Sequence, residues 1–262
     1  MAAASGVGLG LSIPEVAGRA RGAANDSATD ALIARMSVAP GEARAALIDA
    51  LVRALKAAGV WAKLDALYLL AAHDAQAARL NWVGSSFTLA AVNSPGFTVD
   101  RGYAGDGATS YLDSGFTDGS SGGFRRDDGH RGLWCGTNVN GFSFDIGSQR
   151  ARIVSRYNAT AYVWGNSTAG DTPALPAATS MGWTCYSRGS SAAYLFARDG
   201  TQSTVTRASD ALATGSAWIC AASASGYSSR RIQAAHWGRA LSGGEMSALQ
   251  AALAGWMTAV GA

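Results

Sequence analysis

Glutamate and lysine are missing from the middle of this chain: between Asn81 and Leu241 every carboxylate is an aspartate and every strong cation is an arginine. Glutamate and lysine favour exposed helix faces and are depleted from strands. Their absence therefore predicts β structure there, with helices at the two ends, where Glu42, Lys56 and Glu245 lie. It also weakens the case for an enzyme, because a glycoside hydrolase needs two placed carboxylates, which here could only be aspartates.

Cysteines, long apolar runs and one-sided charge are also scarce. Cys135, Cys185 and Cys220 lie in apolar runs without C-x-x-C spacing or a nearby histidine, so we expect buried thiols, no disulfide framework and no zinc site. The lack of any run of about 18 apolar residues predicts that the chain does not span a membrane. The net charge is only +3 and the arginines are scattered, so we expect no nucleic-acid partner.

The first 80 residues divide into an arm and a helical segment. Residues 1–26 are rich in Gly, Ala and Ser and predict a flexible arm, either disordered or ordered on a partner. Asp30 is expected to cap a short helix, and Pro40 to begin a longer one. Residues 27–80 are therefore assigned to a helical preface. Its apolar side chains at helical spacing are Leu47, Ile48, Leu51, Val52, Leu55, Trp61, Leu64, Leu67 and Tyr68.

From residue 85 onwards the hydrophobic period is two. Short runs of aromatic and β-branched residues alternate with Gly, Ser, Asn and Asp clusters, which is typical of an antiparallel sandwich. Asp199-Gly200 predicts a type I′ hairpin turn. A capping box from Ser242 to Glu245 predicts a final helix, so residues 81–262 are assigned to a β-sandwich with a C-terminal helix. The predicted strands are 87–92, 132–139, 142–146, 159–164, 181–187, 192–198, 218–222 and 231–237.

Three segments carry a family resemblance. LVRALKAAGVWAKLDALYLL from Leu51 to Leu70, GYAGDGATSYLDSGF from Gly102 to Phe116, and RIQAAHWGRALSGGEMSALQAALAGW from Arg231 to Trp256 are similar to phage and prophage virion-surface proteins. These proteins carry a concanavalin A-like lectin/glucanase sandwich of LamG type. The resemblance implies a mainly β jelly roll and a place on a virion tail, fibre or head appendage. It assigns no calcium or sugar ligand, since no compact Asp and Asn run matches that of legume lectins.

Aspartates in glycine-rich loops are the first candidate site residues. Asp106, Asp113 and Asp118 have the oxygen ligands that Ca²⁺ requires, but Asp-Gly is first of all a turn former, and we favour turns. We therefore expect no cofactor, with calcium as the alternative. Asp127-Asp128 could form an acid/base pair, although a solvated loop is the favoured interpretation. Long polar loops predict a glycan contact surface, whose candidate residues are Asp127, Asp128, Asn166 and Asp171.

Histidines and aromatic residues give weaker signals. His73, His130 and His236 fall in the preface, a loop and a late strand, which favours ordinary hydrogen-bonded positions over a catalytic group. Aromatic rings can stack on sugars, but at alternate strand positions they are more often core. The residues concerned are Tyr162, Trp164, Trp183, Tyr186 and Tyr194.

The pattern and the resemblance together predict a non-enzymatic virion structural protein that exposes a lectin-like sandwich to host-surface polysaccharide. Its partners would be other virion proteins and further copies of itself, since many weak sites on one particle gain avidity. Two alternatives stay open. One is an Asp-based polysaccharide depolymerase, and the other is a purely structural decoration or cap protein.

Overall fold

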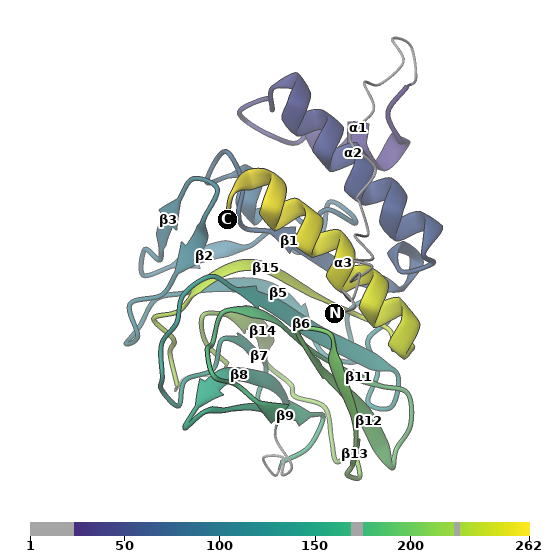
Figure 1. The fold of residues 1–262 in the computed structure, drawn as a ribbon, viewed down its shortest axis with the longest axis vertical. Coiled ribbons are helices and arrows are strands. Elements are labelled where there is room, and N and C mark those ends of the chain that lie inside the picture. Colours follow the sequence, from purple (N-terminus) through teal and green to yellow (C-terminus); the bar gives the residue numbers. More distant parts are fainter. Residues whose placement is uncertain (1–23, 169–174, 223–225) are drawn as a thin grey trace, which may run out of the picture.

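The computed structural model describes residues 24–168, 175–222 and 226–262. Two antiparallel sheets are stacked, and helices cover the outer face of one of them (Figure 1). The predicted mainly β sandwich with helices at both ends of the sequence is therefore confirmed. Most of the predicted arm, residues 1–23, lies outside the described residues. In the described part of the chain no helix is both long and apolar enough to cross a membrane.

The described residues form three α-helices: α1 (Ser27–Ile33), α2 (Glu42–Ala57) and α3 (Gly243–Val260). The predicted capping box begins α3, since Ser242 Oγ accepts from Glu245 N and the Glu245 carboxylate accepts from Ser242 N. The predicted cap of α1 is wrong. Asp26, not Asp30, has the extended backbone of an N-cap and accepts from Ala28 N at 2.9 Å, whereas Asp30 lies in the first turn.

The first sheet, sheet A, has eight strands, with β15 in contact with β6 on one side and with β4 and β1 on the other. The Asp199-Gly200 turn joins β12 to β13 with positive φ at both residues (43° and 88°), which confirms the predicted hairpin. In spatial order the strands are β13 (Thr201–Thr206), β12 (Ala193–Arg198), β11 (Gly182–Arg188), β6 (Gly129–Cys135), β15 (Arg231–Gly238), β4 (Gly102–Ala104) and β3 (Gly96–Thr98), with β1 (Leu64–Leu69) beside β15.

The second sheet, sheet B, has seven strands. Its order is β10 (Leu175–Pro176), β9 (Thr160–Gly165), β8 (Ala151–Tyr157), β7 (Ile146–Gly147), β14 (Ser216–Ile219), β5 (Tyr111–Thr117) and β2 (Ala90–Val92). The predicted strand 142–146 is mostly wrong, because only Ile146 enters a strand and residues 142–145 form a loop. This loop carries Phe142 and Phe144 past the edge of the sandwich core.

Helical spacing misled the prediction for residues 61–71. Only Trp61–Lys63 is helical, as a single 3₁₀ turn, and Leu64–Leu69 is strand β1. Leu67 and Leu69 face the helices while Ala66 and Tyr68 face the other sheet, so both faces of β1 are buried. A strand buried on both faces reads as a continuous apolar run, which periodicity does not separate from a helix.

Two hydrophobic layers follow from this arrangement. Between the sheets, Leu112, Ile153 and Val163 of sheet B pack with Leu133 and Trp237 of sheet A. On the outer face of sheet A, a second cluster joins the strands to α2 and α3. Ile48, Leu51, Val52 and Leu55 of the α2 stripe are buried as predicted, while Leu47 is partly buried. Met246, Leu249, Leu253 and Trp256 of α3 are buried as well. The outer face of sheet B has no helix over it among the described residues (Figure 1).

Candidate functional site

A shallow hollow of about 580 Å³ lies between the β5–β6 loop and the β13–β14 loop. It contains two of the three predicted glycan-contact aspartates, Asp127 and Asp128. Its lining residues are Gly119, Arg125, Arg126, Asp127, Asp128, Asp210, Ala211 and Leu212. The structure therefore places Asp127 and Asp128 at a surface that a ligand can reach.

Both of these aspartates are already bound to protein groups. Asp127 accepts from Ser209 Oγ at 2.5 Å and from Arg126 Nε at 3.0 Å. Burial acts to raise the pKa of Asp127, but these two partners outweigh it and hold the pKa below its usual value. Asp128 accepts from Arg239 Nε at 3.0 Å and from Ala240 N at 2.7 Å. The pair thus fixes loop positions, and neither carboxylate is reserved for a ligand.

Asn166 supports the hollow from beneath. Its side chain is fully buried, and its Nδ2 donates to the Arg126 carbonyl at 2.6 Å. The backbone carbonyl of Asn166 accepts from Asp210 N at 2.9 Å, so this one residue connects the two loops that border the hollow. Asn166 therefore positions the loops and does not present its side chain to solvent. Asp171, the fourth predicted contact, lies outside the described residues.

The three loop aspartates considered for calcium have separate structural roles. Asp106 Oδ1 accepts from the backbone N–H groups of Ala108, Thr109 and Ser110, each at 2.8 Å, and these bonds lower its pKa. Asp113 accepts from Gly115 N, as in a local turn. Asp118 is fully buried in an ion pair with Arg131 at 2.6 Å. Within the ranges that the structure describes, no three His, Cys, Asp or Glu side chains are grouped as metal ligands.

The histidines and cysteines lie mostly in the interior. His130 is on β6 and not in the predicted loop, and it lies beside His236 of β15. His73 is separate and contacts the Val38 carbonyl. The three cysteines are buried free thiols, as predicted, and burial raises the pKa of each. Trp183, Tyr186 and Tyr194 are core residues, also as predicted.

A group of rings on the outer face of sheet B differs from these core residues. We call it the aromatic surface: Phe142, Phe144, Tyr157, Tyr162 and Trp164. Phe142 is 51% exposed and Tyr157 is 36% exposed, while Phe144 and Trp164 are buried behind them. The Phe142 ring centroid lies 5.3 Å from that of Tyr157 and 6.1 Å from that of Trp164. Of the five aromatics that the sequence suggested, only Tyr162 and Trp164 are here.

Strand alternation explains why the rings gather. On β8, Ile153 points into the sandwich core, whereas its neighbours Arg152 and Val154 point outward, and Tyr162 and Trp164 do so on β9. Arg152 pairs in register with Trp164, and Val154 with Tyr162. The loop before β7 then adds Phe142. Sequence reasoning missed Phe142 because it assigned residues 142–146 to a strand, in which Phe142 would be one more core side chain.

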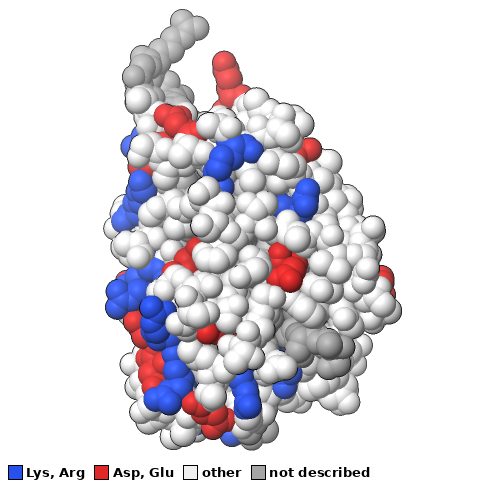
Figure 2. Space-filling model, turned by 180° about the vertical axis from the view of Figure 1, so that it is seen from behind, with Lys and Arg blue, Asp and Glu red and all other residues white. Residues whose placement is uncertain are grey.

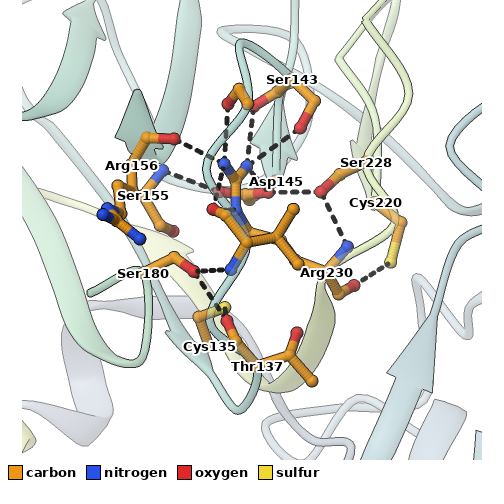
Figure 3. Close-up of polar contacts among 12 residues, drawn as sticks. Cys135, Thr137, Ser143, Asp145, Ser155, Arg156, Ser180, Cys220, Ser228 and Arg230 are labelled. Carbon is orange, nitrogen blue, oxygen red and sulfur yellow. Dashed lines mark hydrogen bonds and ion pairs between the residues drawn. The ribbon is translucent and has the colours of Figure 1, made fainter. Parts of the chain in front are cut away.

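A buried polar network holds the loop of Phe142 in place (Figure 3). The Arg230 guanidinium donates to the carbonyls of Val139, Gly141 and Ser143 on that loop, and to the Arg156 carbonyl on β8. Asp145 balances its charge at 2.9 Å, and it also accepts from Ser155 N and Ser228 Oγ. Both side chains are completely buried. The loop that carries Phe142 and Phe144 is therefore fixed by buried polar contacts.

Charge on the molecule is mixed. Figure 2 shows basic and acidic side chains side by side along one lower edge of the back of the molecule, while much of the rest of this face is uncharged. Opposite charges at such short separations largely cancel each other's field. The charged edge of this face therefore consists of neighbouring opposite charges and does not form a broad patch of one sign.

Comparisons with known proteins find the fold and no sequence family. No family model matches the chain, and no curated protein sequence matches it significantly. A Trypanosoma rangeli sialidase in complex with sialic acid aligns with a TM-score of 0.50 and 12% identity over 81% of this chain and 39% of its own. The binding domain of botulinum neurotoxin serotype D aligns with a TM-score of 0.51 and 6% identity over 74% of this chain and 52% of its own. Domain 4 of a Geobacillus stearothermophilus GH43 arabinanase, in complex with arabinotriose, aligns with a TM-score of 0.46 and 14% identity over 72% of this chain and 98% of its own.

These similarities correct one prediction. A sialidase contains this fold, so a β-sandwich does not separate the chain from enzymes, and the prediction of a non-enzymatic protein is wrong. The chain spans about two fifths of the sialidase's length, and identity is low, so the likeness concerns the fold. The chain is thus a β-sandwich of a kind found in a sialidase and in a toxin binding domain.

Proposed function

We propose that this protein binds glycans through the aromatic surface on sheet B. The observation that carries the proposal is that the Phe142 ring is half exposed and packs against further aromatic rings. Exposed phenylalanine costs hydration free energy unless a ligand covers it. Flat rings with apolar faces suit the C–H faces of sugars, and the hydroxyls of Tyr157 and Tyr162 add polar groups at the same place.

Glycan binding also fits the proteins that share this fold. The sialidase structure was determined with a sugar ligand, and that sugar belongs to that protein. For this chain, the support comes from its own rings and from the fixed loop that presents one of them. The ligand we propose is a host-surface polysaccharide, bound weakly at each site and more tightly by several copies together.

The test is binding of purified protein to surface polysaccharide, measured by calorimetry and by polysaccharide pull-down. Phe142→Ala with Tyr157→Ala should weaken binding about tenfold or more, the size expected for removing two central aromatic contacts. Met181→Ala serves as the matched control, since Met181 is 46% exposed outside the aromatic surface. Equal binding by all three proteins would reject the aromatic surface as the site. Self-association that the double variant abolishes would instead make it a contact between copies of the chain.

We further propose that the protein is displayed in several copies on a virion surface. The support is the resemblance of the segments 51–70, 102–116 and 231–256 to phage and prophage virion-surface proteins. Gold-labelled antibody against the sandwich should decorate intact particles at regular positions in electron micrographs. Particles that lack the protein after purification would contradict this placement.

A further inference from the structure

Arg152 packs against two rings of the aromatic surface. Its guanidinium carbon is 4.1 Å from the ring centroid of Phe144 and 4.7 Å from that of Trp164. Within the described parts of the chain its guanidinium makes no ion pair, and its buried Nε has no hydrogen-bond partner. The fully buried Arg131 and Arg230 differ from it, since each has an aspartate within 3 Å. Among the described residues, Arg152 thus lacks the aspartate that balances these two arginines.

The setting of this arginine favours an anion. Burial, and next the charge of Arg150, lowers the pKa of Arg152, but a guanidinium stays protonated at neutral pH. Partial desolvation of an unpaired charge is unfavourable, and cation–π contact offsets only part of that cost. Its planar fork of N–H donors matches the geometry of a carboxylate. An incoming carboxylate would therefore gain a partner that has lost much of its hydration.

The position of Arg152 relative to the rings restricts the ligand. Phe142 packs against Phe144 and Trp164, the same two rings that flank the guanidinium. A ligand that stacks on Phe142 thus brings its substituents to the guanidinium. Arg152 thus lies on the face of sheet B that carries the rings.

We propose that the aromatic surface selects acidic polysaccharides, with a sugar ring on Phe142 and Tyr157 and the sugar carboxylate on Arg152. This inference rests on the proposed glycan-binding function and names its ligand class. An alternative role for Arg152 is purely structural, as a cationic lid on two buried rings. The two roles differ in one respect: only the first makes affinity depend on the charge of the polymer.

The probes are polygalacturonate, the same polymer after chemical reduction of its carboxyl groups, and dextran sulfate. Wild-type protein should bind polygalacturonate about ten- to a hundredfold more tightly than the reduced polymer, as expected for one charge-assisted carboxylate contact. Arg152→Gln should remove most of this preference. Arg101→Gln removes the same charge from an exposed position on the β3–β4 turn of sheet A, and should leave the preference unchanged.

The outcomes distinguish a failure of the acidic-sugar proposal from a failure of glycan binding itself. Equal affinity for both polymers, lost in Phe142→Ala, would overturn the selection of acidic sugars and keep glycan binding. No binding of either polymer, or binding that ignores Phe142, would overturn both. Tight binding of dextran sulfate that is insensitive to Phe142→Ala would show simple polyanion attraction and also overturn the proposal. Arg152→Gln also removes packing on two rings, so Arg152→Lys provides a second variant that keeps the charge. The comparison of the two polymers with wild-type protein does not depend on either variant.

Discussion

The rings of His130 and His236 lie 5.3 Å apart, and neither side chain is exposed to solvent. His130 Nδ1 contacts the Arg239 carbonyl at 2.6 Å, and His236 Nε2 accepts from Trp183 Nε1 at 3.1 Å. Burial lowers the pKa of His130 from 6.5 to about 4 and lowers that of His236 well below 6.5. Each imidazole is therefore neutral in the folded protein at neutral pH, since two adjacent buried cations would be strongly unfavourable.

This pair predicts a loss of stability in acid. A histidine whose pKa is lower in the folded state binds protons more readily when unfolded. The contribution of such a histidine to the free energy of unfolding is complete above about pH 6.5 and is lost as the pH falls towards 4. For His130 alone the lowered pKa corresponds to roughly 3 kcal/mol. Urea unfolding at a series of pH values should show this decline in the free energy of unfolding.

Variants can isolate the histidines from the carboxylates that also titrate in acid. His130→Asn keeps a donor near the Arg239 carbonyl, and His236→Gln keeps an acceptor for Trp183. The double variant should be less sensitive than wild type to pH between 6.5 and 4, and His73→Asn, at a partly buried histidine outside the pair, serves as the control for replacing a histidine. Identical slopes in wild type and double variant would show that the buried pair does not control acid stability.

A second prediction concerns the ion pair of Asp145 and Arg230. Asp145→Asn keeps the shape but leaves a buried guanidinium without a counter-charge, so the free energy of unfolding should fall by about 3–5 kcal/mol. Asp128→Asn is the matched control, because its partner Arg239 is 61% exposed and such surface pairs contribute about 0–1 kcal/mol. Similar losses in both variants, measured by urea unfolding, would contradict the distinction.

Local patterns predicted much of the fold and little of the binding surface. The capping box at Ser242 and the Asp199-Gly200 turn are set by neighbouring residues, so the sequence alone locates them. The nature of β1 depends on β15, which is remote in sequence, and therefore its leucines were misread as helix. Phe142 is a similar case. Its exposure results from the contacts of Arg230 with its loop, and no local pattern encodes a contact between residues this far apart.

The α2 stripe gives a third prediction. Leu51 is 5% exposed in the layer between α2, α3 and sheet A. Leu51→Asp would bury an unpaired charge there, so it should destabilise the protein by several kcal/mol, seen as a lower melting temperature. Val38→Asp places the same charge at a half-exposed valine and should have little effect. An unchanged melting temperature for Leu51→Asp would show that the stripe tolerates solvent.

The final prediction tests the loop hollow against the aromatic surface. Asp127→Asn with Asp128→Asn should leave glycan affinity within about twofold of wild type, because both carboxylates are occupied by Arg126, Ser209, Arg239 and Ala240 and neither belongs to the aromatic surface. Phe142→Ala, measured alongside by the same calorimetry, should lower the affinity. A loss of binding in the aspartate variant alone would place the glycan site in the hollow. The length of the polysaccharide should be followed in the same samples, since shortening that occurs with wild type and stops in the aspartate variant would assign hydrolysis to Asp127 and Asp128 and give the hollow a catalytic role.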